Sequence, residues 1–133
     1  MRTKKMVASI LAIALVMCTP IKVTEASNIL PEYTVMYGDV MYHAKSEVSN
    51  GTAYCLTSVS SSGVVSVTGT YYYINHETIV TGTSSSTNGG QHYASVSFAA
   101  PTNCTSVRVN GSHRVSFEGQ RWEVSTKDVF DGN

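Results

Sequence analysis

Val64–Ile74, which reads VVSVTGTYYYI, is the segment that most clearly indicates the fold class. From Val65 to Tyr73 every second residue is valine, glycine or tyrosine, and the residues between them are serine, threonine and Tyr72. Because successive side chains of a β-strand point to opposite faces, this alternation predicts a half-buried strand with its valines in the core.

The same alternation recurs in Tyr93–Ala99, where Ala94, Val96 and Phe98 share one face and serines occupy the other. Runs rich in valine, threonine and tyrosine are typical of strands. They predict further strands at Thr52–Val59, Glu77–Thr83, Ser106–Val109, Ser112–Glu118 and Arg121–Ser125. Tyr33–Val48 is interpreted as one bent strand or two short ones.

Turn residues separate these runs. Ser60–Gly63 joins two predicted strands, and Thr83–Gly90 (TSSSTNGG) is predicted as a polar loop. Asn110–Gly111 is the dipeptide suited to a type I′ turn, so it predicts a hairpin between its flanking strands. Asp128–Asn133 is predicted as a loose tail.

No segment after residue 27 repeats an apolar residue at helical spacing, and leucine occurs only at Leu56 after Tyr33. The chain is therefore predicted to be all-β, a small antiparallel β-sandwich of six to eight strands. An immunoglobulin-like arrangement is one alternative. The immunoglobulin signature places a tryptophan between two cysteines, whereas Trp122 follows both Cys55 and Cys104.

The N-terminus has the pattern of a signal peptide. Three basic residues within Met1–Lys5 precede the apolar run Met6–Met17, which is too short to span a bilayer as a helix. Small residues at Thr24 and Ala26 predict cleavage after Ala26, which removes a signal helix at 1–26 and leaves one secreted domain at 27–133. The short lysine-rich start is more typical of a bacterial signal.

Cys18 raises the alternative of a lipoprotein, in which a cysteine after the apolar run receives a lipid. That pathway favours a small residue immediately before the cysteine, and Met17 occupies this position. We therefore expect Cys18 to be discarded with the signal, which leaves the exported domain without a lipid or transmembrane anchor.

The charge of the predicted domain differs from that of the full chain. Residues 1–26 hold four of the nine basic and one of the nine acidic residues, so residues 27–133 have five basic against eight acidic residues and a formal charge of −3. Nucleic acids and anionic membranes attract concentrated positive charge. The composition therefore argues against both as partners.

Two cysteines, Cys55 and Cys104, remain in the predicted domain. Paired cysteines in a small exported protein predict a disulfide. A closed loop of about fifty residues would stabilise the folded state by roughly 4 kcal/mol in the chain-entropy model.

Catalytic and metal-binding patterns are absent from the sequence. The four histidines lack a metal-ligand spacing, and no G-x-S-x-G motif surrounds a serine. We therefore expect no catalytic residue, metal or other cofactor. Amphipathic aromatic side chains among hydroxyls suit protein or glycan surfaces, which makes Tyr72, Tyr93 and Trp122 the candidate binding surface.

These observations rank three functions. The first is a secreted, non-catalytic binding or cell-surface interaction module with an extracellular protein or glycan as partner. The second is a secreted antimicrobial, bacteriocin-like or toxin-like protein, which also requires export and a stable small fold. The third is a small extracellular hydrolase.

Overall fold

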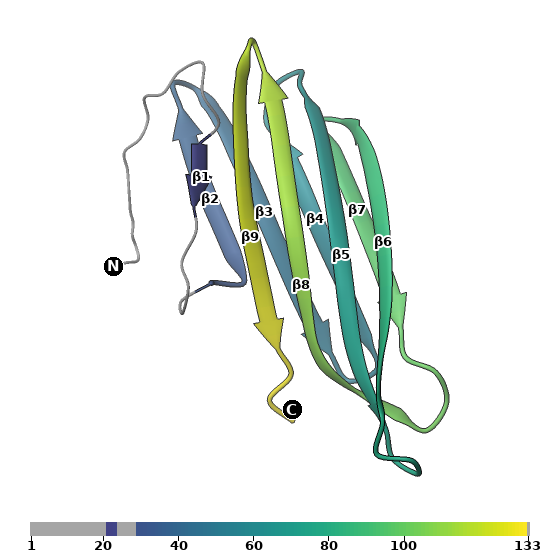
Figure 1. The fold of residues 1–133 in the computed structure, drawn as a ribbon. Coiled ribbons are helices and arrows are strands. Elements are labelled where there is room, and N and C mark those ends of the chain that lie inside the picture. The colour runs from purple at the N-terminus through teal and green to yellow at the C-terminus, as the bar shows by residue number, and fades with distance from the viewer. Residues whose placement is uncertain (1–20, 24–28, 133) are drawn as a thin grey trace.

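The computed structural model describes residues 21–23 and 29–132, and within them it contains strands and no helix (Figure 1). The prediction of an all-β fold is confirmed for these residues. The strands are β1 (Ile21–Val23), β2 (Glu32–Tyr37), β3 (Val40–Ser49), β4 (Thr52–Val59), β5 (Val64–Asn75), β6 (Thr81–Gln91), β7 (Tyr93–Ala99), β8 (Cys104–Phe117) and β9 (Gln120–Val129).

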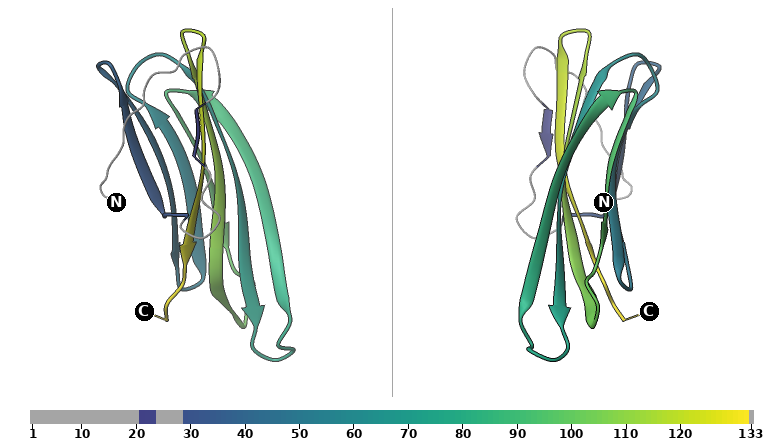
Figure 2. Two further views of the ribbon diagram at one scale, coloured as in Figure 1. Left: turned by 60° about the vertical axis from the view of Figure 1, so that its left-hand side comes forward. Right: turned by 90° about the vertical axis from the view of Figure 1, so that its right-hand side faces the viewer.

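The strands form two sheets that pack face to face, as Figure 2 shows from two sides. Sheet A has the order β1-β9-β8-β5-β6, and sheet B has the order β2-β3-β4-β7. All neighbouring pairs are antiparallel except β1 with β9, which is parallel. Two layers that are antiparallel apart from β1, packed around one core, agree with the expected sandwich.

The strand order differs from the immunoglobulin alternative. In an immunoglobulin domain the third strand crosses to the sheet opposite the first two. Here β2, β3 and β4 are consecutive neighbours in sheet B, and the chain passes from them to sheet A at β5.

Strand β5 lies in the interior of sheet A, between β8 and β6, and it has the predicted alternation. Val65, Val67 and Tyr71 are buried in the core between the sheets. The facing sheet adds inward side chains from β3, β4 and β7, so fifteen buried residues form one core. Burial of this alternating pattern on both layers sets the register of each strand, because a shift by one residue would expose the whole set.

The predicted hairpin at Asn110–Gly111 is wrong, because β8 runs without a turn from Cys104 to Phe117. Gly111 pairs directly with Gly69 of β5, and its lack of a side chain leaves room in the core. The β8–β9 hairpin turns instead at Glu118 and Gly119, which both have positive φ as a type I′ turn requires. Gly111 is therefore required because a side chain there would clash with the core, and not because it adopts a positive φ.

The boundaries around β6 also differ from the prediction. Residues 76–80 form a turn at the lower end of Figure 1, where the side-chain oxygen of Asn75 accepts hydrogen bonds from the backbone N–H groups of Glu77 and Thr78. The predicted loop Thr83–Gly90 lies within β6. This edge strand is exposed on nearly its whole length, so it lacks the apolar alternation that identifies half-buried strands.

The predicted leader and its cleavage site after Ala26 lie almost entirely outside the described residues. Ile21–Val23 are the exception, since their backbone forms β1 along the outer edge of β9. Leu30, which follows the predicted leader, continues this contact because its carbonyl accepts a hydrogen bond from the backbone N–H of Lys127.

Candidate functional site

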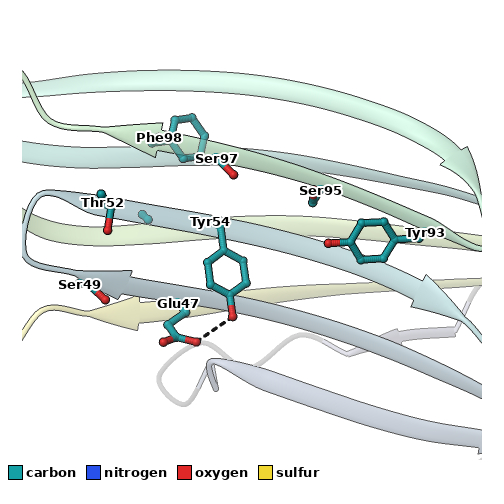
Figure 3. A pocket seen from close by; sticks show the side chains of 9 residues that line it. Glu47, Ser49, Thr52, Tyr54, Tyr93, Ser95, Ser97 and Phe98 are labelled. Carbon is teal, nitrogen blue, oxygen red and sulfur yellow. Dashed lines mark hydrogen bonds between the residues drawn. The ribbon is translucent and has the colours of Figure 1, made fainter.

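Tyr93 lies on the outer face of sheet B, in a shallow depression of about 340 Å³. Its side chain is 54% exposed, as the alternation in β7 predicts for a residue that precedes buried Ala94. Tyr54 of β4 lines the same depression, and Ser95 and Ser97 lie on the intervening part of β7 (Figure 3). The hydroxyl of Tyr93 points along the face toward Tyr54, so the two aromatic side chains flank the hydroxyl groups of Ser95 and Ser97.

Glu47 provides the carboxylate of this depression. The Tyr54 hydroxyl donates a hydrogen bond of 2.8 Å to Glu47 Oε1, and Lys45 Nζ lies 3.3 Å from the same oxygen. The Tyr54 hydrogen bond, and then the Lys45 hydrogen bond, lower the pKa of Glu47 below its ordinary value. Glu47 is therefore an ionised acceptor that is held in place by its neighbours.

Tyr72 lies on the opposite side of the molecule, on the outer face of sheet A. The guanidinium carbon of Arg108 lies 3.9 Å from the centre of its ring, a cation–π contact between directly paired residues of β5 and β8. Tyr72 and Tyr93 thus project from different sheets and cannot contribute to one site.

Trp122 belongs to neither face. Its side chain is fully buried, and its ring centre lies 5.6 Å from that of Tyr42 in the core. The proposal that Trp122 contributes to a binding surface is wrong, because no ligand can reach the ring in the folded protein.

The predicted disulfide is also absent, since Cys55 and Cys104 are both free thiols. Cys55 is buried beside Gly69, whereas Cys104 pairs with Asn75, six residues further along β5. Six residues of strand span about 20 Å, and a disulfide requires Cα atoms within about 7 Å. The register of β5 and β8 therefore keeps the two cysteines apart.

Cys55 instead belongs to a buried polar cluster between the sheets. Thr57 Oγ1 lies 2.8 Å from His113 Nδ1, and Thr126 Oγ1 lies 2.7 Å from His113 Nε2. The contacts continue from Thr126 to Ser46, whose hydroxyl contacts both Thr126 Oγ1 and Cys55 Sγ. The cluster comprises Ser46, Cys55, Thr57, His113 and Thr126.

The hydrogen bonds of this cluster identify the form of the imidazole. The Thr57 hydroxyl donates to the Ser66 carbonyl, so it accepts the hydrogen bond from His113 Nδ1–H. Burial lowers the pKa of His113 to about 4, and the ring is therefore neutral at neutral pH, with Nε2 accepting from Thr126. Burial likewise raises the pKa of the Cys55 thiol. Both groups are uncharged at neutral pH, consistent with a structural role.

Among the described residues, no three histidine, cysteine, aspartate or glutamate side chains are arranged to hold a metal ion. The same part of the chain contains no helix with the length and hydropathy needed to cross a membrane.

Sequence reasoning identified Tyr93 and Tyr72 but missed Tyr54 and Glu47. The signal for Tyr54 was present, because alternation in the predicted strand Thr52–Val59 places it on the face opposite Cys55. Its proximity to Tyr93 and Glu47 depends on β4 lying between β3 and β7, which alternation does not specify.

Comparisons with protein-family models, with curated proteins and with solved structures found no match to this chain. The geometry of its own faces is therefore the basis for a functional assignment.

Proposed function

We propose that this protein is an exported, non-catalytic binding module that binds an uncharged glycan on the outer face of sheet B. The observation that carries the proposal is the depression bordered by Tyr54 and Tyr93, with serine hydroxyls between them. Tyrosine rings offer large apolar faces for the C–H groups of a sugar and hydroxyls for its polar edge.

The electrostatics of this depression favour binding over hydrolysis. A glycosidase uses a pair of carboxyl groups, one of which is a general acid with a raised pKa. Glu47 is the one carboxylate among the described lining residues, and its neighbours lower its pKa. An ionised carboxylate of this kind accepts hydrogen bonds from sugar hydroxyls.

The test is calorimetric titration of the purified chain with a panel of soluble neutral oligosaccharides. Tyr93→Ala should weaken binding roughly tenfold, the effect of losing a stacked aromatic side chain. Tyr72→Ala is the matched control, since it removes a tyrosine from the opposite face, and it should change affinity less than about twofold.

Retention of full affinity by Tyr93→Ala, or the absence of binding across the panel, would contradict the proposal. Hydrolysis of a panel member would replace it with the hydrolase alternative. Inhibition of bacterial growth without glycan binding would favour the antimicrobial alternative.

A further inference from the structure

The basic residues gather on one face of the molecule, although residues 27–133 have a net negative charge. Four of their five lysines and arginines project from the outer face of sheet A, where strand pairing places Arg108, Arg114, Arg121 and Lys127 on β8 and β9. The fifth, Lys45, lies on sheet B beside Glu47. The net charge of residues 27–133 does not reveal this uneven distribution of the basic residues.

One carboxylate lies among the outward side chains of β5, β6, β8 and β9. Glu123 forms ion pairs with Arg114 at 3.1 Å and with Arg121 at 3.2 Å. Lys127 is four residues further along β9, or about 13 Å away, and Arg108 lies further still, opposite Val129. Glu123 therefore does not neutralise the charges of Lys127 and Arg108.

Arg108 and Lys127 line a depression of about 570 Å³ on this face, and the described residues around it include no carboxylate. Its other polar side chains carry hydroxyl or amide groups: Thr68, Thr70, Asn110, Ser112 and Ser125. The volume is within the range of small-molecule binding sites, at roughly 300–1,000 Å³.

One detail suits this depression to a ligand. The Tyr72 ring supports the Arg108 guanidinium from one side, which restricts its position before any ligand binds.

We propose that the outer face of sheet A binds an anionic polysaccharide. Arg108 and Lys127 form charge-assisted hydrogen bonds with its carboxylate or sulfate groups, and the threonine and serine hydroxyls pair with its sugar hydroxyls. This site is independent of the neutral-glycan site, because the two faces belong to different sheets.

A polysaccharide fits this face better than a membrane or a nucleic acid. Proteins that bind membrane surfaces combine basic residues with large apolar side chains that enter the lipid. Here the exposed apolar residues Val64 and Val129 lie at opposite corners of the face, and the apolar residues that line the depression, Ile29, Val107 and Val129, include no aromatic ring. Single-stranded nucleic acids stack their bases on open aromatic rings, whereas Arg108 covers one side of Tyr72.

The experiment measures binding of the full chain to polygalacturonate, which carries carboxylates, and to dextran sulfate, with neutral dextran as the reference polymer. We expect binding to one or both anionic polymers, little binding to dextran, and weaker binding as ionic strength rises. The double variant Arg108→Gln/Lys127→Gln should bind the anionic polymer at least tenfold more weakly, since it loses two charge-assisted hydrogen bonds.

Two variants control for the loss of charge. Lys45→Gln removes a positive charge from sheet B, and Arg121→Gln removes one from sheet A outside the depression; each should change affinity about twofold or less. An equal loss in Lys45→Gln and in the double variant would overturn the proposal, as would an unchanged affinity in a double variant with wild-type circular dichroism. Equal binding to dextran, or binding only to vesicles of phosphatidylglycerol, would overturn it as well.

Discussion

The middle of the core and its Trp122 end are built by the same strands but from different side chains. At the Trp122 end, Trp122 packs against Tyr42 and Val115 is fully buried nearby. In the middle, the glycine pair Gly69 and Gly111 faces the buried polar cluster. Large apolar rings therefore fill one region, and small polar side chains with an imidazole fill the other.

The two regions satisfy their polar atoms differently. In the middle, both imidazole nitrogens of His113 have hydroxyl partners. At the Trp122 end, Trp122 Nε1 and the Tyr42 hydroxyl are buried and have no hydrogen-bond partner among the described residues. Stability at this end therefore depends on packing, whereas the middle depends on hydrogen bonding and on the protonation state of His113.

The largest effect is expected at the apolar end. Trp122→Ala should lower the free energy of unfolding by about 3–5 kcal/mol, because it leaves a cavity at a fully buried position. Trp122→Phe should lower it less, since it keeps a ring beside Tyr42 and removes an N–H that has no partner. Urea denaturation measures both variants. Equal losses would show that ring packing does not stabilise this end.

Acidification should destabilise the middle of the core, where His113 is buried. His113 has a pKa of about 4 in the folded protein against about 6.5 when unfolded, so the unfolded chain binds the proton more tightly. Its stabilisation is complete above pH 6.5 and is lost as the pH falls toward 4, by roughly 3 kcal/mol.

Urea denaturation between pH 7 and pH 4 measures this loss, with His113→Gln as the control. The variant should be less stable at neutral pH, because glutamine cannot reproduce the two imidazole hydrogen bonds, but its stability should depend less on pH. The same pH dependence in both proteins would exclude His113 as the titrating group.

Gly111 lies against the buried polar cluster, which leaves no room for a side chain at this position. A Cβ at Gly111 would lie 2.5 Å from Ser46 Oγ and 2.6 Å from His113 Nε2, so Gly111→Ala should destabilise the protein by about 1–3 kcal/mol. Gly89→Ala is the control, since its nearest contact would be 3.4 Å from the Val65 carbonyl oxygen on an exposed edge strand. Thermal denaturation should separate them, and similar melting temperatures would show that the core has spare volume.

The smallest effect is expected from the cysteines. A reductant should change the free energy of unfolding by less than about 0.5 kcal/mol, because Cys55 and Cys104 are not bonded. Iodoacetamide should modify the half-buried Cys104 in the native protein, whereas burial and a raised pKa protect Cys55. Intact-mass spectrometry measures the number of modified thiols. Resistance of both cysteines to alkylation until a reductant is added would instead support the predicted disulfide.

The sequence predicted strands best where one side of the strand is buried. Thr52–Val59 and Tyr93–Ala99 have the predicted bounds, because each alternates between core and solvent. The predicted strand Glu77–Thr83 overlaps β6 only at its first three residues, and most of β6 escaped prediction because neither of its faces is buried. This strand is held largely by pairing with β5, as in the hydrogen bond between Thr68 and Thr87. Local alternation cannot report a strand that is held mainly by its neighbour.

The candidate sites also depended partly on local alternation and partly on strand order. Alternation placed Tyr72 and Tyr93 on outer faces, but strand order decided that these faces are on opposite sides of the molecule. It also brought Tyr54 and Glu47 to Tyr93 and gathered Arg108 with Lys127.

Local sequence pattern was enough to predict that the described residues form strands and which side of each alternating strand faces the core. These properties depend on neighbouring residues and on the twofold period of a strand. Three properties emerged from the fold alone: Asn110–Gly111 continues a strand, Cys55 lies far from Cys104, and His113 is buried among hydroxyls. Each of these depends on the pairing of segments distant in sequence, whose register is set by packing of the whole core.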